Sequence, residues 1–196
     1  SVLGVVCGRM IAPGSELSTH YWLQNTTALG ELIGFDVSRV SLDRLYKASD
    51  HLLKNKEEIE NHLRAMECRI FNLDEKIILY DLTNTFFEGT GKYNPKARYG
   101  RSKERRSDCP LVTLGLVLDI HGFPKRSRIF EGNISEPGTL ETMIDRLSAD
   151  PDPQGSLIRP TIVMDAGIAS EDNVQWLKSK NYRYIVVSRK KKKETS

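Results

Sequence analysis

A carboxylate in the middle of an apolar segment constrains the fold of this chain more than any other feature. Residues 76–85 read KIILYDLTNT, and the apolar and β-branched residues around Asp81 predict a buried or half-buried strand. A carboxylate there costs free energy unless it is paired or binds a cation. Residues 161–164 (TIVM) repeat the pattern and run directly into Asp165. Two strands that each deliver an aspartate suggest one metal-binding site.

Plainer interpretations of both aspartates stay open at this point. An aspartate in a strand is often a satisfied edge or turn residue, and Asp165, which stands before Ala-Gly, has the position of a residue that ends a strand. The helix signal that follows is clearer. Ser170 is expected to be an N-cap, with Glu171 and Asp172 favouring the helix N-terminus rather than binding metal.

Composition predicts a soluble globular protein. The chain has 196 residues, of which 39% are hydrophobic and 28% charged, enough for one sizeable core with room for a small appended subdomain. No apolar run approaches the roughly 20 residues that cross a bilayer, so no membrane partner is expected. The three cysteines lack CxxC-type spacing, which argues against a disulfide framework and a zinc site and fits a reducing cytoplasm. The first residue, Ser, and the terminal lysine run suggest a fragment at both ends.

Positive charge is concentrated in two short segments. Residues 92–106 carry seven cations against Glu104, and residues 189–193 are five consecutive cations, whereas the remainder has 17 basic and 25 acidic residues. Such confinement suits a partner with a phosphate backbone, because each neutralised phosphate releases counterions. A solvated loop and a frayed basic tail are the alternative.

Residues 1–72 are expected to form a helical N-terminal region with a DNA-binding or accessory role. Ser15 and Ser41 are expected to cap helices, and Asn55 with Glu58 has the form of a capping box. Three apolar sets are predicted to face the core of their helices: Val2, Leu3, Val5, Val6, Met10 and Ile11; Leu42, Leu45, Tyr46, Leu52 and Leu53; and Ile59, Leu63, Met66 and Ile70.

Residues 73–196 change to strand periodicity. Further strands are expected at 111–119, 126–130 and 182–188, with a hairpin at 119–124 and helices after Thr139 and over 171–180. Three strands joined by short turns, followed by alternating helices and strands, predict an α/β fold whose mixed sheet has an antiparallel and a parallel side. This is also the strand order of the ribonuclease-H-like fold, in which the two acids lie on adjacent strands.

Four ordered blocks resemble the catalytic core of bacterial insertion-sequence transposases of the DDE class. They read YDLTNTFFEGTG, YGRSKERRSDCPLVTLGLVLDIHGFP, FEGNISEPGTLETMIDRL and TIVMDAGIASEDNVQWLKSKNYRYIVVSRKKKKE. The resemblance implies that Asp81 and Asp165 are the first two catalytic acids and that they hold two Mg²⁺ or Mn²⁺ ions. The family's third acid, a Glu in a Tyr, Arg, Glu, Lys signature, has no match. We therefore expect an inactive copy, truncated before that helix, with Glu194 only a weak substitute.

Double-stranded DNA, comprising element ends and target, is the partner that the resemblance implies, with a homo-oligomer on DNA and a cytoplasmic, nucleoid-associated location. Asn133 matches a family block after the third strand and is a candidate support for the site. The expected DNA contacts are Ser102, Lys103, Arg105, Arg106, Lys190 and Lys191. Three hypotheses stay open: a transposase, a non-catalytic DNA-binding remnant, and a nuclease of the same fold.

Overall fold

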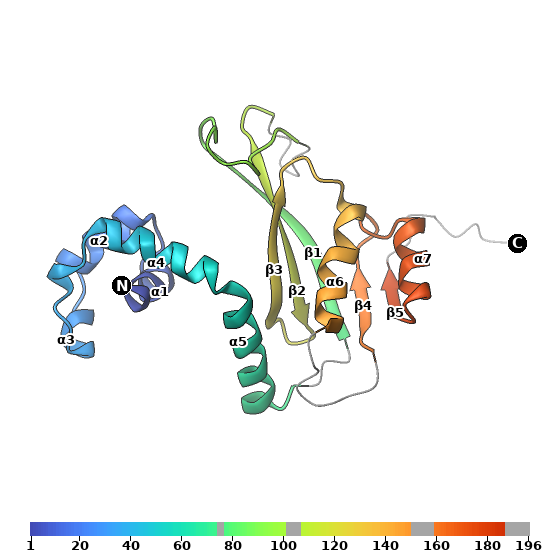
Figure 1. Cartoon of the computed structure of the whole chain (residues 1–196), viewed down its shortest axis with the longest axis horizontal. Coiled ribbons are helices and arrows are strands. Elements are labelled where there is room, and N and C mark those ends of the chain that lie inside the picture. The colour runs from blue at the N-terminus through green and yellow to red at the C-terminus, as the bar shows by residue number, and fades with distance from the viewer. Residues whose placement is uncertain (74–76, 101–106, 150–158, 187–196) are drawn as a thin grey trace, which may run out of the picture. The chain divides into compact units, whose positions relative to one another are not determined.

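The computed structural model describes residues 1–73, 77–100, 107–149 and 159–186 and is shown in Figure 1. The chain forms two compact units, Ser1–His62 and Leu63–Ser196, each of which is described by itself. The domain division at residues 72 and 73 stays a prediction. None of the helices within the described ranges is long and apolar enough to cross a membrane.

The first unit is helical. Its elements are α1 (Val2–Ile11), α2 (Glu16–Asn25), α3 (Leu29–Ile33), the 3₁₀ helix η1 (Val37–Arg39) and α4 (Leu42–Lys54). The predicted N-caps are confirmed, because the Ser15 and Ser41 hydroxyls accept the backbone N–H groups of Ser18 and Arg44. The small core is formed by Val5, Leu23, Val40, Leu45 and Ala48.

Helix packing in this unit corrects the predicted apolar faces. Gly8 faces α2 so closely that a Cβ there would meet the Thr19 side chain at 2.6 Å, so α1 approaches α2 through its small residues. Met10 and Ile11 were expected in the core, but they are 79% and 68% exposed. Leu53 at the end of α4 is also exposed, since the buried residues of α4 are Leu45 and Ala48.

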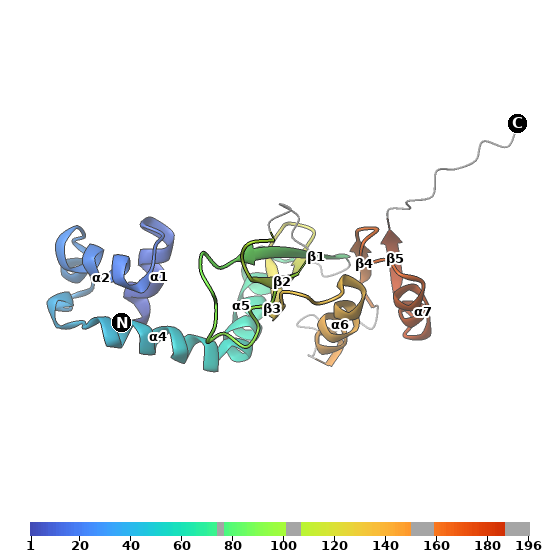
Figure 2. The ribbon, with the colours of Figure 1, turned by 90° about the horizontal axis from the view of Figure 1, so that it is seen from above.

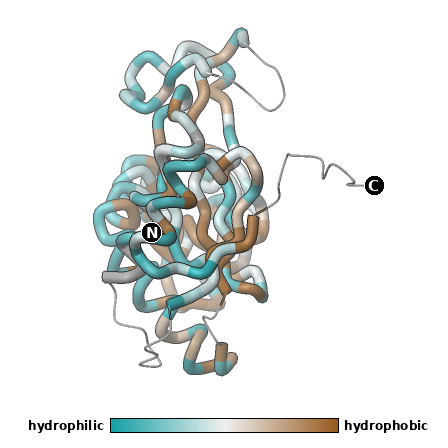
Figure 3. The backbone as a smooth tube through the Cα atoms, turned by 90° about the vertical axis from the view of Figure 1, so that its right-hand side faces the viewer, coloured by the Kyte–Doolittle hydropathy of each residue, from teal (hydrophilic) through white to brown (hydrophobic). Residues whose placement is uncertain are grey.

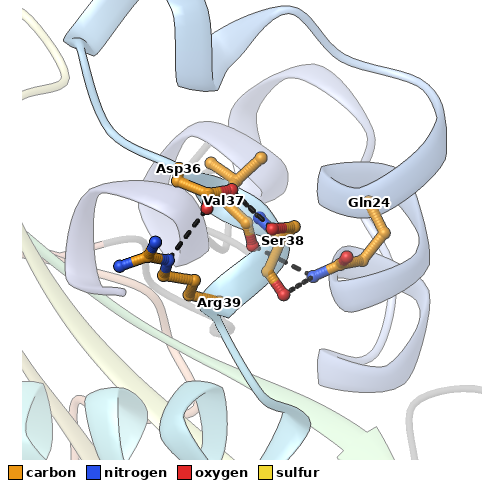
Figure 4. Close-up of polar contacts among 5 residues, drawn as sticks. All are labelled: Gln24, Asp36, Val37, Ser38 and Arg39. Atoms are coloured by element: carbon orange, nitrogen blue, oxygen red, sulfur yellow. Dashed lines mark hydrogen bonds and ion pairs between the residues drawn. The ribbon is translucent and has the colours of Figure 1, made fainter.

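The η1 segment is tied to α2 by side-chain contacts, as Figure 4 shows. The Gln24 amide nitrogen donates to the carbonyl oxygens of Val37 and Val40 at 3.0 and 3.2 Å. Asp36 accepts the Ser38 backbone N–H at 3.1 Å and pairs with Arg39 at 2.9 Å. The Ser38 hydrogen bonds and the Arg39 charge lower the pKa of Asp36, so its carboxylate is the stable form at this turn.

Helix α5 (Lys56–Phe71) runs from the first unit into the second. At its start, the Asn55 amide nitrogen donates to the His51 carbonyl oxygen at 2.8 Å, at the end of α4, and the capping box stays a prediction. Its predicted core face is also wrong in part. Leu63 and Ile70 are 51% and 61% exposed, whereas the buried positions of the helix are Arg64 and Cys68.

The second unit contains a five-stranded mixed sheet of order β3-β2-β1-β4-β5. The strands are β1 (Ile77–Phe86), β2 (Leu111–Asp119), β3 (Pro124–Glu131), β4 (Thr161–Met164) and β5 (Arg183–Val186). β1, β2 and β3 pair antiparallel, while β4 pairs parallel with both β1 and β5. The predicted mixed α/β architecture is therefore confirmed.

The two faces of this sheet differ. Figure 2 shows α6 (Leu140–Ala149) and α7 (Glu171–Ser179) together on one face. The core lies between them and the strands, and in it the Tyr80 hydroxyl lies 2.7 Å from the Thr139 hydroxyl. The buried core residues are Ile78, Tyr80, Leu82, Val117, Phe130, Leu140, Met143, Ile144, Ile162, Met164, Ile168, Leu177 and Tyr182.

The opposite face is apolar but only partly covered. Its side chains alternate with the core residues along each strand and include Leu79, Leu114, Leu116, Leu118 and Val163, all half-buried. Within the described ranges, the helices with side chains in the core all pack on the other face. In Figure 3 the hydrophobic stretches lie mostly in the middle of the tube, while the coloured part at the top is mostly hydrophilic.

Candidate metal centre

Asp81 and Asp165 lie side by side on neighbouring strands. Tyr80 of β1 pairs in parallel register with Met164, the last residue of β4, and Asp81 and Asp165 follow these two residues directly. Neighbouring strands are about 4.7–4.9 Å apart, and residues at one register position point to the same face. These aspartates are 84 positions apart in the sequence but only about one strand spacing apart in the fold.

Each carboxylate uses one oxygen locally. Asp81 Oδ1 accepts the backbone N–H of Leu82 at 2.8 Å. Asp165 Oδ1 accepts those of Gly167 and Ile168, both at 3.0 Å, which shapes the turn from β4 toward α7. The Oδ2 atom of each accepts no hydrogen bond and pairs with no cation from the described part of the chain, so both Oδ2 atoms are available as ligands.

An open cavity of about 470 Å³ brings the two aspartates together. Its floor is the partly covered apolar face, formed by Leu79, Leu114, Leu116, Leu118 and Val163, with Thr83 at the side of β1. The sequence had not marked these leucines as site residues. Leu114, Leu116 and Leu118 show the i, i+2 spacing of residues on one face of a strand, but which face of the sheet stays open depends on where the helices pack.

The donor set suits a hard divalent cation. Two exposed carboxylates with available oxygens are the ligands that Mg²⁺ and Mn²⁺ prefer. No group of three or more His, Cys, Asp or Glu side chains that could hold a metal occurs among the described residues. Two protein ligands leave most of an octahedral shell to water or substrate, which is usual for Mg²⁺ bound at phosphates.

The predicted DNA contacts all lie outside the described residues. These are Ser102, Lys103, Arg105 and Arg106 in the loop, and Lys190 and Lys191 at the end, together with the weak candidate Glu194. Of the same basic loop, the structure describes Lys92, Lys96 and Arg98. The Lys96 ammonium donates to the Ile129 carbonyl oxygen, and Arg98 lies 3.9 Å from Glu131, so both are held against β3.

The remaining candidates lie at turns or at a helix start, and a supporting role of Asn133 at the site stays a prediction. Asn133 is exposed in the turn after β3, where the Ile134 N–H donates to the Glu131 carbonyl oxygen. Glu171 and Asp172 are exposed in the first turn of α7, which Ser170 caps as predicted. Asp119 closes the β2–β3 turn by accepting two backbone N–H groups, and it also pairs with the buried Lys125, a contact that was not foreseen.

Comparison with known proteins returned no matching family model and no matching curated protein. Similar solved structures include a Mos1 transposase paired-end complex with left transposon end, at 11% identity and a TM-score of 0.39 over 94% of this chain. A piggyBac transposase synaptic complex with hairpin DNA matches at 14% identity and a TM-score of 0.43 over 99% of the chain. The chain spans 57% and 43% of those two proteins. At TM-scores below 0.5, the function is better inferred from the residues of the chain itself.

Proposed function

We propose that this chain belongs to the catalytic core of a DDE-class DNA transposase with a ribonuclease-H-like sheet. The observation that carries the proposal is the pair of aspartates, Asp81 within β1 and Asp165 directly after the parallel β4, which follow the last paired residues of the two strands and line one open cavity. The transposase-like sequence blocks supply the reaction class. Two steps are proposed. A phosphodiester at the element end is cleaved by water, and the 3′-hydroxyl that this frees then attacks a phosphodiester of the target DNA.

Different residues of the chain would bind the metal ions and the DNA. Asp81 and Asp165 would each offer a carboxylate oxygen to divalent cations, Mg²⁺ or Mn²⁺. Two such ions, when bound, supply an activated water or 3′-hydroxyl on one side of the phosphodiester and a stabilised leaving oxygen on the other. The leucines beneath exclude water from one side of the site, which strengthens charge interactions there. The basic loop and basic end would bind DNA phosphates.

Two carboxylates hold a pair of metal ions less well than three carboxylates do. A second cation with few protein ligands must rely on water and on the substrate phosphate, so its occupancy and position should suffer. We therefore propose that the 196-residue chain binds DNA and divalent metal but performs little strand transfer alone. Products of cleavage without strand transfer would favour the nuclease alternative, and DNA binding without metal binding would favour a non-catalytic remnant.

The test is the Mn²⁺ dependence of thermal unfolding, measured for the whole chain. At a Mn²⁺ concentration tenfold above Kd, binding to the folded state stabilises it by about 1.4 kcal/mol. For a unit of this size we expect a rise in Tm of roughly 4–8 °C. Asp81→Asn should abolish most of the rise, because the amide is a weaker ligand and carries no charge.

The matched control is Asp172→Asn, which removes an exposed carboxylate on α7 away from the paired strands. It should keep the full Mn²⁺-dependent rise in Tm. Binding of duplex DNA in the absence of metal should be similar for all three proteins. An equal Mn²⁺ response in the wild type and Asp81→Asn would reject the aspartate pair as the metal centre.

A further inference from the structure

In its described part, the segment between β1 and β2 is held to the sheet by backbone hydrogen bonds. Arg98 and Leu111 exchange two backbone hydrogen bonds of 3.0 and 2.8 Å, and the Gly132 N–H donates to the Lys96 carbonyl oxygen at 3.1 Å. A Cβ at Gly100 would collide with the carbonyl oxygen of Gly132. Residues 94–100 therefore follow the ends of β2 and β3 at backbone contact distance.

A tight turn precedes this anchored part. The Asn94 N–H donates to the Gly91 carbonyl oxygen at 2.9 Å, and the Asn94 side chain accepts the Lys96 N–H at 3.0 Å. Gly91 has a φ of +56°, a conformation that glycine adopts at little cost, and it packs against Ala97. The position of residue 93 at the tip of the turn is thus set by local hydrogen bonds.

Two tyrosine rings are exposed on this segment. Tyr93 is 94% exposed, the highest value among the large hydrophobic side chains of the described residues, and Tyr99 is 64% exposed. The Lys92 ammonium lies 6.0 Å from the centre of the Tyr93 ring. Single exposed aromatic residues are common, but two within seven residues, on an anchored segment with three cations, form a more specific pattern.

We propose that Tyr93 and Tyr99 stack on unpaired bases of a DNA strand. The phosphates of that strand are bound by the cations of the same segment, Lys92, Lys96 and Arg98. Positively charged grooves with exposed aromatic rings are how proteins bind single strands, since every base offers a face for stacking. Cations beside the rings favour this partner over an apolar protein surface. The proposal rests on the proposed function and adds a strand-separated region to its DNA substrate.

The distance along β1 locates the contacted bases. Asp81 is five residues before Phe86, at which β1 ends. This corresponds to about 17 Å at roughly 3.3 Å per residue. A DNA strand advances about 3.4 Å per nucleotide in a duplex. A base that stacks near the end of β1 should therefore lie on the order of five nucleotides from the phosphate at Asp81 and Asp165.

The experiment uses the full chain and two probes: a single-stranded DNA oligonucleotide that carries 2-aminopurine, and the matching blunt duplex. Fluorescence anisotropy at fixed salt measures Kd, and quenching of 2-aminopurine reports stacking. Each Tyr→Ala substitution should weaken single-strand binding by about 5- to 150-fold, so Tyr93→Ala combined with Tyr99→Ala should weaken it by roughly 30-fold or more and remove the quenching. The two Tyr→Phe substitutions, which keep the rings, should stay within about threefold of the wild type.

Tyr21→Ala is the matched control, because Tyr21 is 66% exposed on α2 in the other unit. It should leave single-strand binding unchanged, and thermal unfolding should show that all variants fold. Unchanged single-strand affinity and quenching in the double Ala variant would overturn the proposal, as would an equal loss of duplex binding. If the wild type binds neither probe, the proposed function fails as well, so the two failures are distinguishable.

Discussion

Replacing Lys125 by methionine is expected to destabilise the second unit strongly, because it would leave a buried carboxylate without its cation. The Lys125 side chain is 2% exposed, and its ammonium lies 3.4 Å from both Asp119 Oδ2 and Glu67 Oε2. The Asp119 side chain is only 1% exposed. This cluster attaches the second half of α5 to the β2–β3 turn, next to the stacked rings of Phe71 and Phe123.

The loss of stability in Lys125→Met can be estimated from the burial of the Lys125–Asp119 ion pair. Methionine keeps most of the apolar stem of lysine, so the packing loss is small. Breaking a buried ion pair by removing one partner costs about 3–5 kcal/mol, since the other charge stays desolvated. For a unit of this size the fall in Tm should be roughly 10–25 °C. Adding Asp119→Asn removes the orphaned charge but keeps an acceptor for the turn, so the double variant should be more stable than Lys125→Met alone.

Urea denaturation followed by tryptophan fluorescence measures both effects. The chain has two tryptophans, and a Trp22→Phe background leaves Trp176, which stacks on Tyr182, as the reporter of the second unit. Lys178→Met, at an exposed position on α7, is the control and should change stability by less than about 0.5 kcal/mol. A Lys125→Met variant within about 1 kcal/mol of the wild type, or a double variant less stable than the single one, would refute the reasoning.

Two further predictions concern one hydrogen-bonded side chain in each unit. The pKa of Glu16 is lowered, chiefly by a hydrogen bond from its own backbone N–H, with burial opposing and Arg9 and Ser49 assisting. Because a depressed carboxyl pKa stabilises the fold above the unfolded value of about 4.3, Glu16→Gln should lower Tm at pH 7 and lose that effect as pH falls below about 4; an equal loss at both pH values in thermal scans would contradict this. Tyr80→Phe removes the buried hydrogen bond to Thr139 and should cost about 1–3 kcal/mol in urea denaturation, whereas a neutral result would show that the bond contributes nothing.

Local signals in the sequence predicted much of the fold. Caps at Ser15, Ser41 and Ser170 were correct because a hydroxyl that accepts a backbone N–H is decided within three residues. The β2–β3 pair also followed, since a short turn implies antiparallel neighbours, and helical crossovers imply the parallel ones. The antiparallel pairing of β1 with β2 bridges the longer segment 87–110, so no short turn predicts it. That Asp81 and Asp165 are register neighbours is a consequence of this order; their binding of metal stays a prediction.

What the sequence could not predict depended on contacts between distant segments. The apolar spacing of α5 favoured Leu63 and Ile70 as core residues, yet Arg64 and Cys68 are buried. The Lys125 contact joins residues 58 positions apart, and no local pattern reports such a pair. Likewise, the apolar side chains around the aspartates became recognisable as a cavity floor only once α6 and α7 were seen on the other face.

The parallel register of β1 and β4 restricts how this protein can change by insertion and deletion. Successive residues of a strand point to opposite faces, so adding or removing one residue within β4 would turn Asp165 toward the core and away from Asp81. A change of two residues would keep the face but shift the carboxylate along β1 by about 6.6 Å. Related chains that retain both carboxylates should therefore keep β4 free of length changes, while its individual apolar residues can be exchanged for others of similar volume.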